Sequence, residues 1–225
     1  MPSAFGLAML NALNHPNETF QLSLNDGPLM PQRCNAFLTL RQEEVDLFNG
    51  ISLPERARVL DYGCGTGRHL VHLRTGRADI HCVGIEVCDG LRTHCAGAVS
   101  EPAKFFAHWH QAKEMGPFEL ILLMGNGLGV LGKEQEARTQ LRELVRSMAP
   151  GGRIVIETGN WNGRGYRTDT LEIRYQGHVD GPFPWGGADR TWVTDELQAL
   201  GADVTLSRSW APGGFLFFAI ASLAA

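Results

Sequence analysis

The chain has 225 residues, a formal net charge of −4 and a hydrophobic fraction of 44%. This length suits one α/β domain with appendages and is short for two full domains, while the absence of a basic run argues against a nucleic-acid partner. Its five cysteines show no C-x-x-C spacing, which is typical of reduced thiols and matches no common zinc pattern, so we expect no bound metal.

The first 50 residues precede the regular pattern of the chain and predict a separate N-terminal cap. An apolar segment at residues 4–13 predicts a helix, and residues 41–48 predict another. Between them, the Asn25-Asp26-Gly27 sequence is typical of a tight turn that joins two strands. We expect this cap to cover a ligand site.

From residue 58 onward, strand and helix patterns alternate, which predicts an α/β fold built on a parallel sheet. The apolar run at residues 118–124 is typical of a central strand that is buried on both faces. Residues 133–148 predict an amphipathic helix that Pro150-Gly151-Gly152 ends. Strands are expected at residues 58–62, 80–86, 104–109, 118–124 and 153–157, with further helices from residue 67 to 74 and from 89 to 99.

Residues 161–192 interrupt this alternation with a segment rich in glycine and aromatic residues. Within it, Leu171, Ile173 and Tyr175 alternate with polar side chains, as in one strand of a hairpin. An insertion at the carboxyl edge of a sheet is a common place for substrate recognition. We therefore expect residues 161–192 to form a substrate lid.

The end of the chain predicts a helix capped by Thr194 and two strands, at residues 204–210 and 215–220. The link between these strands is too short for a crossover helix, so they must be antiparallel. The whole chain is expected to form a single domain, with the cap at residues 1–50, the core at residues 55–160 and 193–225, and the lid between the two core segments.

Residues 59–69, with the sequence VLDYGCGTGRH, are the most informative stretch. An acid ends the strand, and three glycines follow at alternate positions, where they permit the backbone angles and the close ligand approach that a Cβ would obstruct. A dinucleotide-binding loop would have its third glycine where this chain has Arg68. Asp61 also suits a cationic aminoacyl ligand better than a pyrophosphate. The stretch resembles motif I of the class I S-adenosylmethionine-dependent methyltransferases.

This resemblance implies a Rossmann-like, doubly wound, seven-stranded sheet with an antiparallel last strand. It also implies S-adenosylmethionine as cofactor and S-adenosylhomocysteine as product. The cofactor-binding residues expected in the loop are Asp61, Gly63, Cys64, Gly65 and Gly67.

Four further residues are expected to contact the cofactor. Glu86 ends the second strand 25 residues after Asp61, close to the spacing at which an acid binds the ribose hydroxyls. Val87 would then lie near the adenine ring, with His108 or Trp109 at its other edge. The alternative for these aromatic side chains is ordinary core packing.

Residues 125–129, with the sequence GNGLG, follow the buried fourth strand and correspond by resemblance to motif IV. Gly125 would present its carbonyl to the methionine amino group, and Asn126 would either orient the acceptor or cap the turn. Methyltransferases that act on exocyclic base amines or on glutamine often have an Asn/Asp-Pro-Pro-Tyr sequence in this loop. This chain has no proline there, which argues against those acceptors.

Methyl transfer from an activated sulfonium chiefly needs alignment and exclusion of water. A base is needed only if the acceptor carries a proton at neutral pH, and Glu157 and His178 are the candidates. Aromatic side chains of the lid could form a wall against an apolar acceptor, and its arginines could bind an acidic acceptor. The alternative is a tightly packed lid whose arginines are solvated. The residues proposed for these roles are Trp161, Tyr166, Arg167 and Trp185.

The sequence therefore predicts S-adenosylmethionine-dependent methyl transfer to a small molecule, and its arginine-rich composition is associated with bacterial secondary metabolism. A protein or peptide methyltransferase and a non-catalytic cofactor-binding module remain alternatives, whereas Asp61 and Arg68 disfavour a nicotinamide oxidoreductase. No lysine or arginine precedes Arg33, and the apolar run at residues 215–225 is shorter than the roughly 20 residues of a bilayer span. We expect a cytoplasmic protein without membrane contact.

Overall fold

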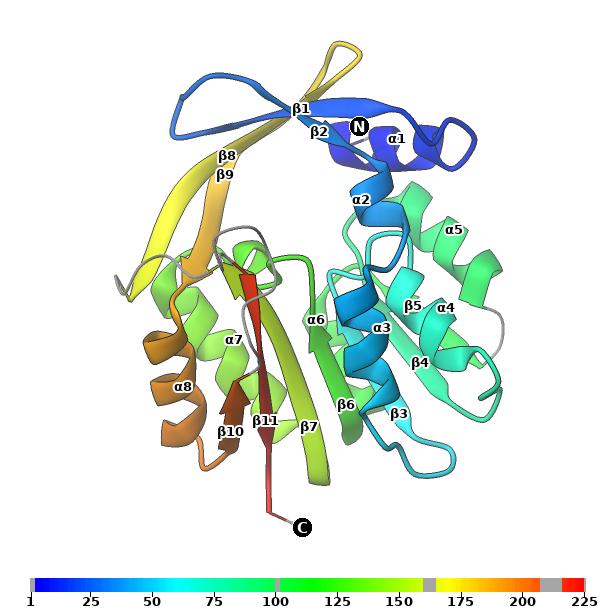
Figure 1. Ribbon diagram of the computed structural model, residues 1–225, viewed down its shortest axis with the longest axis vertical. Coiled ribbons are helices and arrows are strands. Elements are labelled where there is room, and N and C mark those ends of the chain that lie inside the picture. The colour runs from blue at the N-terminus through cyan, green and yellow to red at the C-terminus, as the bar shows by residue number, and fades with distance from the viewer. Residues whose placement is uncertain (1–2, 100–101, 160–164, 207–215, 225) are drawn as a thin grey trace.

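The computed structural model describes residues 3–99, 102–159, 165–206 and 216–224, and these form two β-sheets with helices around them (Figure 1). The strands of the larger sheet are β3 (Arg58–Tyr62), β4 (His81–Ile85), β5 (Ala103–Phe106), β6 (Phe118–Leu123), β7 (Met148–Gly159), β10 (Asp203–Leu206) and β11 (Leu216–Ser222). The strands of the smaller sheet are β1 (Thr19–Leu24), β2 (Met30–Arg33), β8 (Tyr166–Tyr175) and β9 (His178–Ala188).

The larger sheet has the strand order β10-β11-β7-β6-β3-β4-β5. Strands β3 to β7 pair in parallel, while β11 is antiparallel to both β7 and β10. This arrangement confirms the expected Rossmann-like, seven-stranded sheet with an antiparallel last strand.

Alternating side chains on each strand give this sheet two separate apolar cores, as the period of a strand requires. On one face, Val59 and Leu122 pack against α3 (Gln42–Asn49), α4 (Arg68–Arg74) and α5 (Asp89–Val99). On the other face, Leu60 and Ile121 pack with α7 (Glu134–Arg146) and α8 (Arg190–Ala199), beside the short helix α6 (Trp109–Ala112). The cofactor loop thus starts from strands that are fixed on both sides.

The smaller sheet, in the order β2-β1-β8-β9, joins the N-terminal segment to the insertion, a pairing that the sequence did not predict. The turn between β1 and β2 has Asn25 and Asp26 in left-handed conformations, as expected, and Leu22 of β1 lies opposite Ile173 of β8. The helices α1 (Ala4–Ala12) and α2 (Asn35–Leu38) lie beside this sheet, and α1 buries Met9 with it. In Figure 1 the smaller sheet lies over the end of the larger one at which β6 and β7 finish.

Several predicted boundaries are wrong, for identifiable reasons. Helix α8 begins at Arg190 because Asp189 caps it, accepting a hydrogen bond from the backbone N–H of Trp192 at 2.8 Å, so Thr194 is not the cap. Helix α7 ends at Arg146, two residues earlier than predicted. Strand β7 already begins at Met148, and residues 150–152 lie inside it, although their proline and glycines had indicated a break before the strand. Strand β5 ends at Phe106, since His108 already precedes a helix.

The ends of the last two predicted strands, at residues 207–210 and 215, lie outside the described residues. None of the helices within the described ranges combines the length and apolarity that a bilayer crossing requires.

Candidate active site

The loop between β3 and α4 opens at the carboxyl end of the sheet. Its three glycines, Gly63, Gly65 and Gly67, all have positive φ angles between 54° and 78°, which explains their spacing in the sequence. A Cβ built at Gly65 would meet no atom within 4 Å, so the space beside the loop is open there. Cys64, by contrast, is buried, and its thiol faces the protein interior beside Gly84. Only its backbone is therefore available to a ligand.

Asp61 is the last residue but one of β3 and is almost completely buried, with 1% of its surface exposed. Its Oδ2 atom lies 3.0 Å from Nδ1 of His69. Its Oδ1 atom has no hydrogen-bond partner among the described residues. A buried carboxylate oxygen without a partner is costly, and a ligand that carries a cationic amino group would relieve that cost. The arrangement fits the aminoacyl end of S-adenosylmethionine.

Glu86 follows β4 and lies beside the same loop. Its Oε2 accepts the backbone N–H of Gly65 at 3.1 Å, and its Oε1 accepts that of Cys88 at 2.8 Å. Burial raises the pKa of Glu86, although these two backbone hydrogen bonds oppose the change. A carboxylate offers about four acceptor positions, so two remain for a pair of hydroxyl groups. The neighbouring Val87 is 72% exposed, which is unusual for an apolar side chain and leaves a surface for a flat ring.

His108 and Trp109 lie just beyond β5. His108 is exposed and its ring stacks on that of His110 at a centroid distance of 5.6 Å. Trp109 packs partly against the apolar core, and its Nε1 has no hydrogen-bond partner within the described ranges. Both lie at the carboxyl edge, since Phe106 accepts a hydrogen bond from the backbone N–H of Glu86. Their part in cofactor binding stays a prediction.

A second loop follows β6. Gly125 and Asn126 both have positive φ angles, near 60°, so the chain reverses sharply here. The hydroxyl of Thr158 donates to Oδ1 of Asn126 at 3.2 Å. The side-chain oxygen of Asn126 is thus bound to β7, and both of its expected roles stay predictions.

Glu157 is fully buried on β7 and reaches under this second loop. Its Oε2 accepts the backbone N–H of Gly125 at 2.6 Å, and its Oε1 accepts Nη2 of Arg41 at 2.5 Å. Because both oxygens already hold hydrogen bonds inside the protein, the geometry favours a positioning role for Glu157 over that of a general base.

The structure does not bring His178 to the same place. It lies exposed at the start of β9, opposite Tyr175 at the tip of the hairpin, whereas Tyr166 and Ala188 pair at its base. The length of a ten-residue strand, about 30 Å, separates the two ends. His178 therefore lies far from the base of the hairpin, and the structure does not support it as a catalytic base.

The predicted substrate residues differ in their surroundings. Tyr166 donates from its hydroxyl to the Gly132 carbonyl at 2.7 Å, and Arg167 donates from Nε to Asp169 at 2.5 Å, so both have structural partners. The ring of Trp185 lies so close to Gly129 that a Cβ there would come within 2.1 Å of it. Trp185 thus covers the second loop, while Trp161 lies outside the described residues.

A buried charged cluster beside Asp61 was missed by sequence reasoning. Glu44 of α3, which is 0% exposed, accepts hydrogen bonds from Arg41 and Arg68, each at 2.8 Å. The ring of His69 lies between Glu44 and Asp61 and contacts both. Arg68 and His69 stand in the motif, but nothing in the sequence links them to a glutamate more than twenty residues earlier.

The charges in this cluster change one another's pKa values. Burial alone would raise the pKa of Glu44, but the hydrogen bond from His69 and the charges of Arg68 and Arg41 outweigh it and lower the pKa to about 2. Burial alone would lower the pKa of His69, but the charge of Asp61 and the hydrogen bonds to Asp61 and Glu44 raise it above its ordinary value. Both shifts favour the charged forms.

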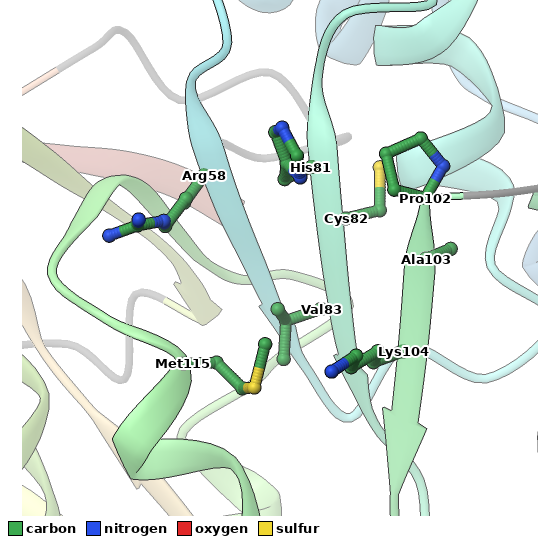
Figure 2. Close-up of a pocket in the computed structure, with 8 residues that line it drawn as sticks. All are labelled: Arg58, His81, Cys82, Val83, Pro102, Ala103, Lys104 and Met115. Carbon is green, nitrogen blue, oxygen red and sulfur yellow. The ribbon is translucent and has the colours of Figure 1, made fainter.

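A small cavity of about 80 Å³ lies elsewhere, against the amino-terminal ends of β3 and β4, where Arg58 and His81 begin their strands (Figure 2). Figure 2 shows Arg58 pointing away from Lys104, so its cationic groups do not converge on one point. Because the two ligand loops lie at the opposite end of these strands, the cavity is not part of the candidate site.

Comparison with known proteins agrees with this geometry. A family model described as a methyltransferase domain matches residues 36–190. A dTDP-4-amino-2,3,4,6-tetradeoxy-D-glucose N,N-dimethyltransferase from Saccharopolyspora spinosa is 30% identical over 105 residues, which are 47% of this chain and 41% of that protein. A dTDP-3-amino-3,4,6-trideoxy-alpha-D-glucopyranose N,N-dimethyltransferase from Streptomyces venezuelae is 25% identical over 104 residues, 46% of this chain and 43% of that protein. The match thus spans about two fifths of the length of these curated relatives.

Solved structures resemble the fold over more of the chain. An S-adenosylmethionine-dependent methyltransferase from Bacteroides fragilis, in complex with S-adenosyl-L-homocysteine, has a TM-score of 0.79 at 14% identity and covers 99% of this chain and 95% of its own. The 1,6-didemethyltoxoflavin-N1-methyltransferase of Burkholderia thailandensis has a TM-score of 0.61 at 17% identity and covers 82% and 78%. Since the family model spans more than half of the chain, this protein belongs to the methyltransferase domain family, and its fold is that of the class I S-adenosylmethionine-dependent methyltransferases.

Proposed function

We propose that this protein transfers a methyl group from S-adenosylmethionine to a small-molecule acceptor and releases S-adenosylhomocysteine. The observation that carries the proposal is the unpartnered, buried Oδ1 of Asp61 beside an open glycine loop. That oxygen needs a hydrogen-bond donor which the described protein does not supply, and the amino group of the cofactor is such a donor.

The chain's own residues would hold the cofactor from three sides. Asp61 would bind its amino group, Glu86 its ribose hydroxyls and Val87 its adenine ring, while the loop at Gly125 would approach the aminoacyl part. When bound, the cofactor supplies a methyl group on an activated sulfonium. What remains for the protein is to align the acceptor with that methyl group and to exclude water. The smaller sheet, which lies over the carboxyl edge, is placed to do both.

An amine is the acceptor that we propose to test first. A neutral amine can attack the methyl carbon without a general base, the carbon–sulfur bond breaks to give S-adenosylhomocysteine, and the methylated ammonium then loses its proton to water. This suits a site where both oxygens of Glu157 are already engaged. The two curated relatives are named as N,N-dimethyltransferases of dTDP-linked amino sugars. A sugar of this kind, with a free amino group, is therefore the first acceptor class to assay.

Calorimetric titration with S-adenosylmethionine, S-adenosylhomocysteine and NAD tests the cofactor. We expect micromolar binding of the first two only, and we expect Asp61→Ala or Glu86→Ala to weaken it by roughly 5- to 150-fold, the scale of a lost charged hydrogen bond. Asp203→Asn, at an exposed position on β10, is the matched control and should bind normally. Binding of NAD alone, or unchanged affinity in both site variants, would overturn the assignment.

Mass spectrometry of acceptor mixtures tests the transfer itself. A mass increase of one or two methyl groups on an amino sugar supports the proposal, and transfer to a protein or peptide would favour that alternative. If the cofactor binds but no small molecule or peptide is methylated, the protein is a cofactor-binding module.

A further inference from the structure

A continuous series of charged groups, all buried except the partly exposed Arg41, connects the N-terminal segment to both ligand loops. It runs from Asp61 through His69 to Glu44, and from there through Arg41 to Glu157, which holds the backbone of the second loop. Arg41 precedes helix α3, on which Glu44 lies, so a segment outside the larger sheet supplies the centre of the series. Such a series fixes side-chain orientations only while every member keeps its partners.

His69 is the member on which the orientation of Asp61 depends. Its Nδ1 lies 3.0 Å from Asp61 Oδ2 and its Nε2 lies 3.3 Å from Glu44 Oε1. Because both partners are acceptors, both ring nitrogens must carry protons, and this requires the imidazolium form. A neutral ring has one N–H and could donate to Asp61 or to Glu44 but not to both, and only Glu44 has further donors, in Arg41 and Arg68, among the hydrogen bonds described here.

The surroundings of the ring come from three elements. Asp61 on β3 and Glu44 on α3 supply negative charge, whereas Arg68 on α4 and Arg41 before α3 supply positive charge. The ring of Phe48 on α3 covers the imidazole at a centroid distance of 5.9 Å. The imidazole is thus enclosed, with its edges held between two carboxylates.

We propose that Glu44 and His69 are positioning residues that hold Asp61 with one oxygen turned toward the cofactor, so that cofactor binding depends on the docking of α3. The inference rests on the proposed function, because it concerns affinity for S-adenosylmethionine and its product. With His69 protonated, Oδ2 of Asp61 is fixed and Oδ1 remains available. When the ring loses a proton at higher pH, it can no longer donate to both carboxylates, so Asp61 is held less firmly and the affinity falls.

Nuclear magnetic resonance of the imidazole ring tests the network without the cofactor. The pKa of His69 lies above its ordinary value in the wild type, and we expect Glu44→Gln, which keeps the shape but removes the charge, to lower it. Glu43→Gln is the matched control, since Glu43 lies next to Glu44 on α3 and is exposed. If the ring titrates at its ordinary pKa in the wild type, or if Glu44→Gln leaves it unchanged, the inference is overturned even though the proposed function stands.

Calorimetry with S-adenosylhomocysteine, from about pH 6 to about pH 10, tests the link to binding. Wild-type affinity should fall as the pH rises through the pKa measured for His69. Glu44→Gln and His69→Asn should each bind roughly tenfold more weakly at neutral pH, and His69→Asn should show no such fall. His72→Asn, on the same helix, is the control and should keep the wild-type profile.

The outcomes separate the two claims. Folding is checked by circular dichroism, and if neither variant folds, the wild-type pH profile against the measured ring pKa decides the question. A merely structural role for Glu44 and His69 would lower the melting temperature of the variants and leave a flat profile in the wild type, which would overturn the inference. If the wild type does not bind S-adenosylhomocysteine at any pH, the proposed function fails and this inference fails with it.

Discussion

The two sheets of this protein are stabilised by different interactions. The central strands of the larger sheet are apolar on both faces, and Leu60, Leu120 and Leu122 are completely buried. The smaller sheet is covered on one side by α1 through a smaller apolar cluster that includes Met9 and Ile173, and polar contacts join the two as well. Asp180 accepts hydrogen bonds from the Ser3 hydroxyl and the Phe5 backbone, at 2.7 and 2.9 Å.

This difference separates the two halves of the proposed reaction. The two loops that we propose bind the cofactor follow strands of the larger, apolar sheet, whereas the proposed acceptor side is the smaller sheet, which has a smaller apolar cluster and polar contacts to α1. Rigid strands position reacting groups accurately, and less stable elements can move to admit a substrate. The two sheets meet where Trp185 packs on Gly129 and where Tyr166 donates to Gly132. Changes in one sheet should therefore alter cofactor binding, and changes in the other should alter acceptor binding.

The largest effect is expected from Leu122→Ala in the larger sheet. The leucine is 0% exposed, and its removal should lower the free energy of unfolding by about 2–5 kcal/mol through lost burial and the remaining cavity. Val179→Ala, on the smaller sheet and 53% exposed, should cost less than about 0.5 kcal/mol. Denaturant unfolding of both variants measures the contrast. Equal losses would show that the two sheets do not differ in this way.

The next effect concerns the stability of the protein at low pH, which depends on the charged cluster beside the glycine loop. Glu44 has a pKa of about 2 in the folded protein, against 4.5 for an ordinary glutamate. Its stabilisation is present above the ordinary value and disappears as the pH falls through about 2. After screening by solvent this contribution is about 2 kcal/mol.

Urea unfolding at several pH values measures that contribution. Glu44→Gln should be less stable than the wild type above about pH 5, and the gap should close toward about pH 2, where the glutamate is protonated. Glu43→Gln, which is exposed on the same helix, should follow the wild type throughout. A gap that stays constant with pH would mean that the charge of Glu44 contributes nothing to stability.

The same contrast decides what could be predicted from the sequence. Local patterns determine the larger sheet: the apolar run of β6, and the acid and glycines after β3, predict their own structure because each residue's role depends on near neighbours. The smaller sheet depends on the pairing of Leu22 with Ile173, and no local pattern records a partner about 150 residues away. Glu44 was missed for the same reason, since an isolated glutamate in an amphipathic helix predicts a solvated side chain.

Some errors arose within local patterns as well. Thr194 and Asp189 both suit a helix start, and only the end of β9 at Ala188 decides between them. Glu157 was predicted as a base from its place near the end of a strand, and that role stays a prediction. Its two hydrogen-bond partners, Arg41 and Gly125, lie far away in the chain, where no local pattern indicates them. A residue's position can thus be predicted from its strand, whereas its role depends on contacts that the fold creates.

A smaller effect is expected where the two sheets meet. In Gly129→Ala the new Cβ would lie 2.1 to 2.6 Å from ring atoms of Trp185, so the indole and β9 must shift. We expect the KM for the acceptor to rise roughly tenfold, about 1.4 kcal/mol, while affinity for S-adenosylhomocysteine stays the same. Gly97→Ala on α5, where a Cβ meets nothing within 4 Å, is the control. Weaker cofactor binding with an unchanged KM would place Trp185 on the cofactor side.

The smallest effect is expected at the polar contacts between α1 and the hairpin. The hydroxyl of Tyr175 accepts from Asn11 at 2.6 Å and donates to Glu18 at 2.9 Å. Tyr175→Phe removes these two hydrogen bonds and a third, which Gln176 Nε2 donates to the same hydroxyl at 3.0 Å, but it keeps the buried ring, so the cost should be about 1 kcal/mol. Hydrogen exchange should then quicken in the amides of α1 and of the tip of the hairpin. The exchange of the β3 and β6 amides should not change, because the two sheets share few contacts near that tip. If exchange quickened equally in α1, the hairpin tip, β3 and β6, these elements would open together as one unit.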